Sequence, residues 1–145
     1  MSSYKNPALT VDVIIQKGDA ILLVKRGNEP FKGKLALPGG FVEWNEKVED
    51  AAVREVKEET GIEVKLRELL GVYSDPKRDP RRHVVTVVFV ADALHDRVIA
   101  GSDAENAAWV KPEEVKESEL SFDHWKIIQD YLKWRKTKET FWSSK

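Results

Sequence analysis

Runs of apolar residues, separated by short polar segments, divide much of the chain into strands. Val, Ile, Thr and aromatic residues dominate the runs, and clusters of Gly, Pro, Asp and Asn separate them, as is typical of β-structure. The turn Lys17-Gly18-Asp19 joins the first two runs into a predicted hairpin, and the third is expected to bend near Gly71. The predicted strands span residues 9–16, 20–24, 64–73, 83–91 and 107–110.

Two other segments have the periodicity of helices. One follows Gly40, with Asn45 placed to cap its first turn and Gly61 placed to end it. The second begins near residue 121 and carries a stripe of aromatic and branched residues. Residues 137–145 are expected to form a loose tail, apart from Phe141 and Trp142. Strands on both sides of a helix predict an α/β fold, in which helices cover both faces of a mixed sheet and all 145 residues form one domain.

Two carboxylates of the first predicted helix lie on its apolar side, where a surface helix normally carries no charge. Glu55 and Glu59 are one turn apart on the stripe that also carries Val48, Ala52 and Ile62, and Glu58 lies at its edge. Burying unpaired carboxylates is costly, so this stripe indicates a bound cation, and oxygen ligands suit Mg²⁺ or Mn²⁺. The alternative is a solvated acidic face held by ion pairs one turn apart.

The same segment resembles the Nudix box. Gly40 is followed after five residues by Glu46, and after seven more by Arg54-Glu55-Val56-x-Glu58-Glu59-x-Gly61-Ile62; Leu37-Pro38-Gly39-Gly40 precedes it. The resemblance implies a Nudix-type α/β/α sandwich and a divalent-cation-dependent hydrolase that acts on a nucleoside diphosphate linked to another group. It also implies that Glu58 joins the metal ligands when further ions bind. The expected metal ligands are Gly39, through its carbonyl, Glu55, Glu58 and Glu59.

Two further roles in the predicted active site stay open. Arg54 either orients a helix carboxylate, which we favour, or contacts phosphate, and Glu46 is expected on the solvent side with a structural role. Family members often place the catalytic base on a loop outside the box. Asp103 and Glu105 are therefore candidates, with Glu105 preferred and Glu55 as a third. The alternative is that both loop residues are simply solvated.

A basic loop follows the third predicted strand. Residues 74–82 contain four cations and two prolines, and the stiff backbone favours bidentate binding of phosphate by arginine. Its Asp-Pro and Arg-x-His elements resemble those of ADP-ribose pyrophosphatase-like Nudix members, which favours ADP-ribose as substrate. A solvated surface loop is the alternative. The candidate substrate-binding residues are Arg26, Arg78, Arg81 and Arg82, and Phe31, Trp44 and Tyr73 are equally suited to stacking on a base or to packing.

The composition excludes several other classes of protein. A net charge of −1 offers no global field for nucleic acid or membrane, and the absence of cysteine excludes disulfides and thiol chemistry. No apolar stretch is long enough to span a membrane, so a cytoplasmic protein is expected. Homodimers are frequent among the proteins that the box resembles. The rival functions are a nucleoside triphosphate pyrophosphohydrolase and a Nudix module that senses a nucleotide without turnover.

Overall fold

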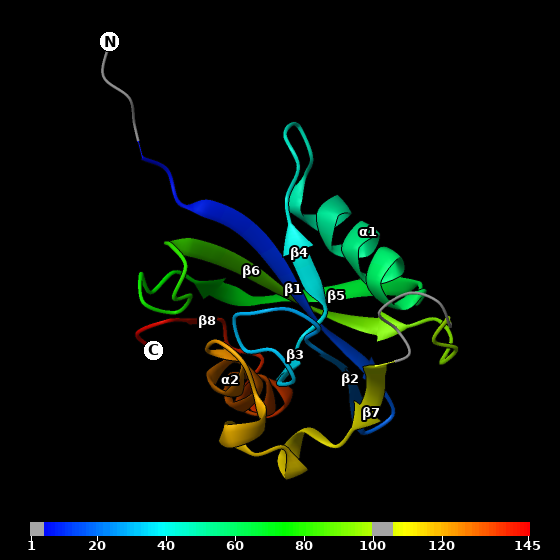
Figure 1. Cartoon of the computed structure of the whole chain (residues 1–145). Coiled ribbons are helices and arrows are strands. Elements are labelled where there is room, and N and C mark those ends of the chain that lie inside the picture. Colours follow the sequence, from blue (N-terminus) through cyan, green and yellow to red (C-terminus); the bar gives the residue numbers. More distant parts are fainter. Residues whose placement is uncertain (1–4, 100–105) are drawn as a thin grey trace.

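The centre of the fold is a mixed β-sheet with strands from the whole length of the chain (Figure 1). The strand order is β3-β2-β1-β6-β5-β8, while β4 pairs with β1 and β7 pairs with β2. β1 runs parallel to β6, and β5 runs parallel to β8. The computed structural model describes residues 5–99 and 106–145. Its strands are β1 (Ala8–Lys17), β2 (Ala20–Lys25), β3 (Leu35–Ala36), β4 (Gly39–Phe41), β5 (Val64–Tyr73), β6 (Val84–Ala93), β7 (Ala107–Val110) and β8 (Phe141–Trp142).

Helices cover both faces of this sheet, with α1 (Val48–Thr60) on one side and α2 (His124–Thr137) on the other (Figure 1). Alternation along β1 divides the core, because successive side chains of a strand point to opposite faces. Val11 and Val13 pack in the cluster that contains the buried side of α1, whereas Ile14 packs in the cluster that contains α2. The predicted α/β/α sandwich is therefore confirmed. Two short 3₁₀ turns, η2 (Pro112–Glu114) and η3 (Glu117–Glu119), lead from β7 to α2.

The ends of α1 confirm one predicted cap and correct the other. Gly61 adopts a left-handed conformation with φ 75°, and its N–H donates to the carbonyl of Lys57, as expected for a glycine that ends a helix. Asn45 does not cap the helix, because α1 begins at Val48 with Lys47 as the N-cap. Asn45 instead takes φ 64° in the preceding turn, a conformation that Asn tolerates better than most residues.

The predicted loose tail is wrong, because residues 137–145 include a strand of the sheet. β8 pairs in parallel with β5, where Phe141 lies opposite Gly71 and Trp142 lies opposite Val72. A Cβ atom on Gly71 would lie 1.9 Å from the carbonyl oxygen of Phe141, so glycine is required for this approach. The ladder between β5 and β6 also shifts register just before Gly71, where the bend was predicted. A two-residue strand is too short to leave a periodic signal in a sequence.

The sheet opens between β1 and β2 and makes room for a pocket. These strands pair at Gln16 with Ile21 and at Lys17 with Ala20, next to the turn that joins them. Earlier in β1, residues 10–12 pair with β4 instead. β1 and β2 therefore separate on one side of the hairpin, and the side chains of Thr10 and Asp12 reach the space between them. Neither helix within residues 5–99 and 106–145 is long and apolar enough to cross a bilayer.

Candidate active site

Arg54 of α1 holds three carboxylates at one edge of the site. Its Nε and Nη2 atoms donate to Glu46 at 2.7 and 2.9 Å. Its Nη1 atom donates to Glu55 at 2.8 Å and to Glu58 at 3.1 Å. The planar guanidinium fixes the carboxylates relative to one another, which a single ammonium group would not do. This geometry agrees with the orienting role that the sequence favoured for Arg54 over a phosphate contact.

Glu46 lies closer to the site than the sequence predicted. Its side chain was expected on the solvent side of the helix, yet it is 15% exposed and lies against Arg54 in the turn before α1. The hydrogen bonds from Arg54, aided by a backbone bond at Glu43, lower the pKa of Glu46 to about 2. Glu46 therefore stays ionised and keeps the guanidinium in place, which is the structural role that was expected.

The two carboxylates of the helix stripe meet the glycine backbone of β4. The N–H of Gly39 donates to Glu59 Oε2 at 3.1 Å. A Cβ atom on Gly40 would lie 2.3 Å from Glu55 Oε2, so any larger residue there would displace that carboxylate. Successive glycines thus let the backbone of β4 lie against both carboxylates.

This donor set suits a divalent cation that is completed by water and substrate. Glu55 and Glu59 provide hard oxygen atoms, and the backbone of Gly39 lies beside them. Glu58 differs from them, since its side chain is 61% exposed and turned towards Arg54. Across the described part of the chain, no three acidic or histidine side chains gather as a ready cluster of ligands. Mg²⁺ is commonly held by one or two carboxylates together with substrate phosphates, so a smaller protein contribution fits it.

A polar pocket with a volume of about 200 Å³ extends from these carboxylates towards α2. Glu59, Gly39, Gly40, Phe122 and His124 are all among its lining residues. Its charged and polar lining residues are Thr10, Asp12, Lys25, Arg26, Asn28, Glu59, Arg78, Asp79, Arg81 and His124.

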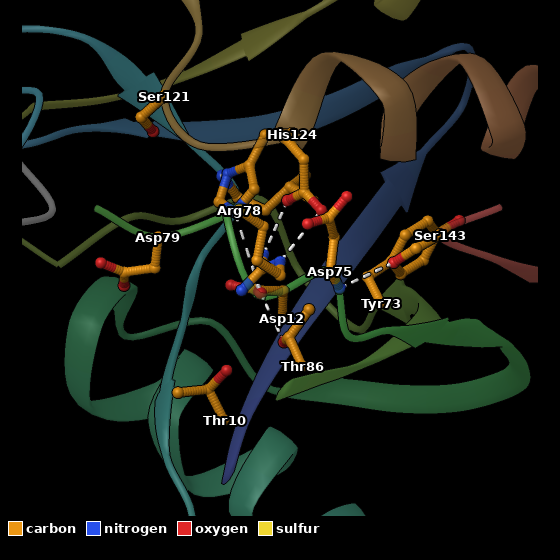
Figure 2. A network of polar contacts seen from close by, with 12 residues as sticks. Thr10, Asp12, Tyr73, Asp75, Arg78, Asp79, Thr86, Ser121, His124 and Ser143 are labelled. Carbon is orange, nitrogen blue, oxygen red and sulfur yellow. Dashed lines mark hydrogen bonds and ion pairs between the residues drawn. The ribbon is translucent and has the colours of Figure 1, made fainter. Parts of the chain in front are cut away.

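Asp12 and His124 lie side by side in this pocket (Figure 2). The hydroxyl of Thr86 on β6 donates to Asp12 Oδ2 at 2.6 Å. His124 Nδ1 accepts the N–H of Leu37 at 3.0 Å, which leaves Nε2 to carry the proton of the neutral ring. That Nε2 atom faces Asp12 Oδ2 at 3.8 Å. Strand β1, strand β6 and the start of α2 thus position an acceptor beside a donor.

Burial moves both pKa values towards the neutral forms. It raises the pKa of Asp12 to about 7, against the opposing effects of the Thr86 hydrogen bond and the charge of Arg78. Burial also lowers the pKa of His124 to about 3, although the carboxylate of Asp123 opposes the shift. His124 is therefore an uncharged donor at neutral pH, and its contact with Asp12 is not an ion pair.

The basic loop is more strongly engaged within the protein than its composition suggests. Arg78 is buried and donates to both carboxylate oxygens of Asp123 at 2.9 and 2.7 Å, which fastens the loop to the start of α2 (Figure 2). Arg81 makes a similar pair with Asp79 at 3.1 and 2.8 Å. Arg82 lies 5.9 Å above the ring of Phe41. Two of the three candidate arginines in this loop therefore already hold a carboxylate.

The remaining candidates divide into those near the pocket and those away from it. Arg26 lines the pocket, with its guanidinium 4.8 Å from the centre of the Phe122 ring. Of the suggested stacking residues, Phe31 packs on Phe122, Tyr73 is buried against Asp130, and Trp44 is 90% exposed. The candidate bases Asp103 and Glu105 lie outside the described residues.

Sequence reasoning missed Asp12, Thr86, Phe122 and His124. Asp12 did leave a signal, because it is a lone carboxylate within the apolar run of the first strand. Thr86 lies within strand β6, Phe122 in the turn before α2 and His124 at the start of that helix, and tertiary packing alone brings them to the same pocket or its border as Asp12.

The sequence and its relatives identify the class of protein that carries this site. A family model for the NUDIX domain matches residues 6–131, and the chain belongs to this family. Among curated relatives, the chain is 53% identical over 132 residues to the ADP-ribose pyrophosphatase of Methanocaldococcus jannaschii, which covers 91% of this chain and 77% of the relative.

Solved structures give the same family. A NUDIX hydrolase from Nitrosomonas europaea matches with a TM-score of 0.81 and 29% identity, covering 97% of this chain and 78% of that one. The NUDIX domain of Shewanella oneidensis NrtR, solved in complex with ADP ribose, matches with a TM-score of 0.76 and 28% identity. The match covers 90% of this chain and 89% of that one.

Proposed function

We propose that this Nudix family member hydrolyses the diphosphate bond of ADP-ribose to give AMP and ribose 5-phosphate, with Mg²⁺ or Mn²⁺ as cofactor. The observation that carries the proposal is the set of Glu55 and Glu59 against Gly39 and Gly40, at the end of a polar pocket. The name of the archaeal relative and the ADP-ribose complex of the NrtR domain support the choice of nucleotide.

We assign the cation to Glu55, Glu59 and the carbonyl of Gly39, with Glu58 joining when a further ion binds. A bound divalent cation neutralises phosphate oxygens and lowers the pKa of a coordinated water. Arg54 keeps Glu55 and Glu58 in position through its hydrogen bonds at 2.8 and 3.1 Å. Glu46 in turn keeps Arg54 in position.

The protein must also remove a proton from the attacking water. Glu105 stays the first candidate for this base, Asp103 the second and Glu55 the third. Glu55 is the member of this group with a described position, and its Oε1 atom already accepts a hydrogen bond from Arg54, so Oε2 would have to accept the proton. Water adds across one phosphorus–oxygen bond of the diphosphate, so that each product carries one phosphate.

We assign Arg26, Arg81 and Arg82 to the substrate, since Arg26 and Arg81 line the pocket and Arg82 lies above Phe41 at its rim. Arg78 also borders the pocket, but its contacts with Asp123 support a role in holding the loop. A homodimer and a cytoplasmic location stay predictions from the sequence.

Product analysis tests the proposal. The purified protein, incubated with ADP-ribose and Mg²⁺, is expected to release AMP and ribose 5-phosphate, and chelation should stop the reaction. Preferential hydrolysis of oxidised nucleoside triphosphates with release of pyrophosphate would favour the rival enzyme. Tight binding of ADP-ribose with no turnover in either metal would indicate a sensing module instead.

A further inference from the structure

Among the described residues, Phe41 and Phe122 are the phenylalanine rings that line the pocket beside the metal carboxylates. Arg26 lies 4.8 Å from the centre of the Phe122 ring. Arg81 lies 5.9 Å from the same centre, and Phe31 contacts the ring edge-on with centroids 4.9 Å apart. A purine is normally held by stacking on an aromatic side chain. The Phe122 ring is therefore already in contact with other side chains and is poorly placed to stack on adenine.

Its floor instead presents a hydrogen-bond acceptor next to a donor. Asp12 Oδ2 is held by Thr86, whereas Oδ1 has no hydrogen-bond partner within the described residues. His124 carries its proton on Nε2, 3.8 Å from the Asp12 carboxylate, and this N–H likewise makes no hydrogen bond to a described residue. A hydroxyl group is able to donate to the one and accept from the other with a single oxygen atom.

The walls and the size of the pocket favour the same kind of ligand. Carboxylate and guanidinium groups both line it, including those of Asp79, Arg81 and Arg26, and such groups are able to form hydrogen bonds with the several hydroxyls of a sugar. A volume of about 200 Å³ is below the range of roughly 300–1,000 Å³ that holds a drug-sized ligand. Apolar rings are available at the rim, where Phe41 is 47% exposed and Trp44 lies close by in the chain.

We propose that the pocket binds the terminal pentose of the substrate, with Asp12 as the residue that accepts a hydrogen bond from one of its hydroxyls and His124 as the accompanying donor. The nucleobase then lies outside the pocket, near the exposed rings. Thr86 is a positioning residue, because it touches Asp12 and orients its carboxylate. This proposal rests on the proposed function of the same site. It adds that the pocket recognises the terminal pentose of the substrate and not its nucleobase.

Substrate analogues test whether the pocket recognises the terminal pentose or the nucleobase of ADP-ribose. The measurement is kcat/KM for ADP-ribose, for analogues that lack the 2- or the 3-hydroxyl of the terminal ribose, and for the analogue with hypoxanthine in place of adenine. For the unaltered protein, at least one deoxy analogue should be poorer by roughly fivefold to a hundredfold, the scale for leaving a buried polar partner without its hydrogen bond. The hypoxanthine analogue should differ from ADP-ribose by about threefold or less.

Two variants test whether Asp12 and Thr86 cause the preference for ADP-ribose over its deoxy analogues. In Asp12→Asn and in Thr86→Val, the penalty for the deoxy analogue should shrink to about threefold or less. Asp130→Asn is the matched control, because Asp130 is also buried but bonds Tyr73 and Lys126 away from the pocket. A ratio of kcat/KM values for one preparation is independent of how much of it is folded, so partial unfolding does not obscure the result.

The outcomes distinguish the two proposals. A large hypoxanthine penalty that disappears in Asp12→Asn shows that the pocket reads the base and overturns the pentose assignment. Equal rates for all the analogues also overturn it. If the unaltered protein does not hydrolyse ADP-ribose, the proposed function fails and this proposal fails with it. Normal hydrolysis with the wrong selectivity leaves the proposed function intact.

Discussion

At the scale of single residues, charges in apolar surroundings are the best guide to the site. Glu55 and Glu59 break the apolar stripe of α1, and the structure brings both to the glycines of β4. Asp12 breaks the apolar run of β1 in the same way and lies in the adjoining pocket. The sequence reveals such positions because burying a carboxylate is costly and needs compensation. It does not reveal the partners, since Thr86 and His124 are far from Asp12 along the chain.

Glu59→Gln tests the assignment of the cation at this scale. Glutamine keeps an oxygen to accept the Gly39 N–H but removes the negative charge. Turnover of ADP-ribose at saturating Mg²⁺ should fall by about 10²-fold or more, the scale for loss of a major electrostatic contributor. The free energy of unfolding in metal-free buffer should not decrease, because repulsion from Glu55 is relieved. Glu49→Gln, on the exposed first turn of α1, is the control, and similar kcat values for both variants would contradict the assignment.

At the scale of elements, prediction succeeded where a segment is long and regular. β1, β5 and β6 have ten residues each and match the predicted strands to within two residues at either end, and α1 ends at the predicted glycine. β3 and β4 were not predicted as strands, and neither was β8. Each has only two or three residues, so tertiary pairing rather than local periodicity determines its conformation.

Phe141→Ala tests whether β8 belongs to the folded core. Phe141 is buried at 3% exposure and packs in the cluster under α2 with Leu70 and Tyr73. Truncation of a buried phenylalanine typically costs about 3–5 kcal/mol, and a site near the chain end should fall at the lower limit. Urea unfolding measures the change. Trp142→Ala, at a half-exposed neighbour, should cost under about 1 kcal/mol, and equal small effects of the two changes would support a loose tail after all.

At the scale of the whole molecule, the site forms where elements from both layers meet. α1 contributes the carboxylates, β4 the glycines, and β1 and β6 the floor of the pocket. The ion pair between Arg78 and Asp123 fastens the 74–82 loop to α2 on the opposite layer. Removing one member of such a buried pair would leave a charge without compensation, so the pair couples the geometry of the loop to that of the helix.

The pH dependence of folding tests the buried pair of Asp12 and His124. Asp12 has its pKa raised from 3.8 to about 7, so the folded protein binds more protons between these values and loses stability as pH rises. His124 has its pKa lowered from 6.5 to about 3, so the folded protein binds fewer protons there and gains stability as pH rises. Between about pH 4 and 6.5 the two slopes, each of at most about 1.4 kcal/mol per pH unit, oppose each other.

Replacing either residue should therefore leave only the pH dependence of the unfolding free energy that the other residue causes. Urea unfolding at pH 4.5 and 6.5 in metal-free buffer gives the comparison, and all other groups cancel when each variant is measured against the unaltered protein. Asp12→Asn should gain stability relative to the unaltered protein as pH rises across this interval, by up to about 2–3 kcal/mol. His124→Gln should lose stability by a similar amount. Changes of the same sign in both variants would contradict the opposite shifts, because only groups that titrate in opposite directions on folding give slopes of opposite sign.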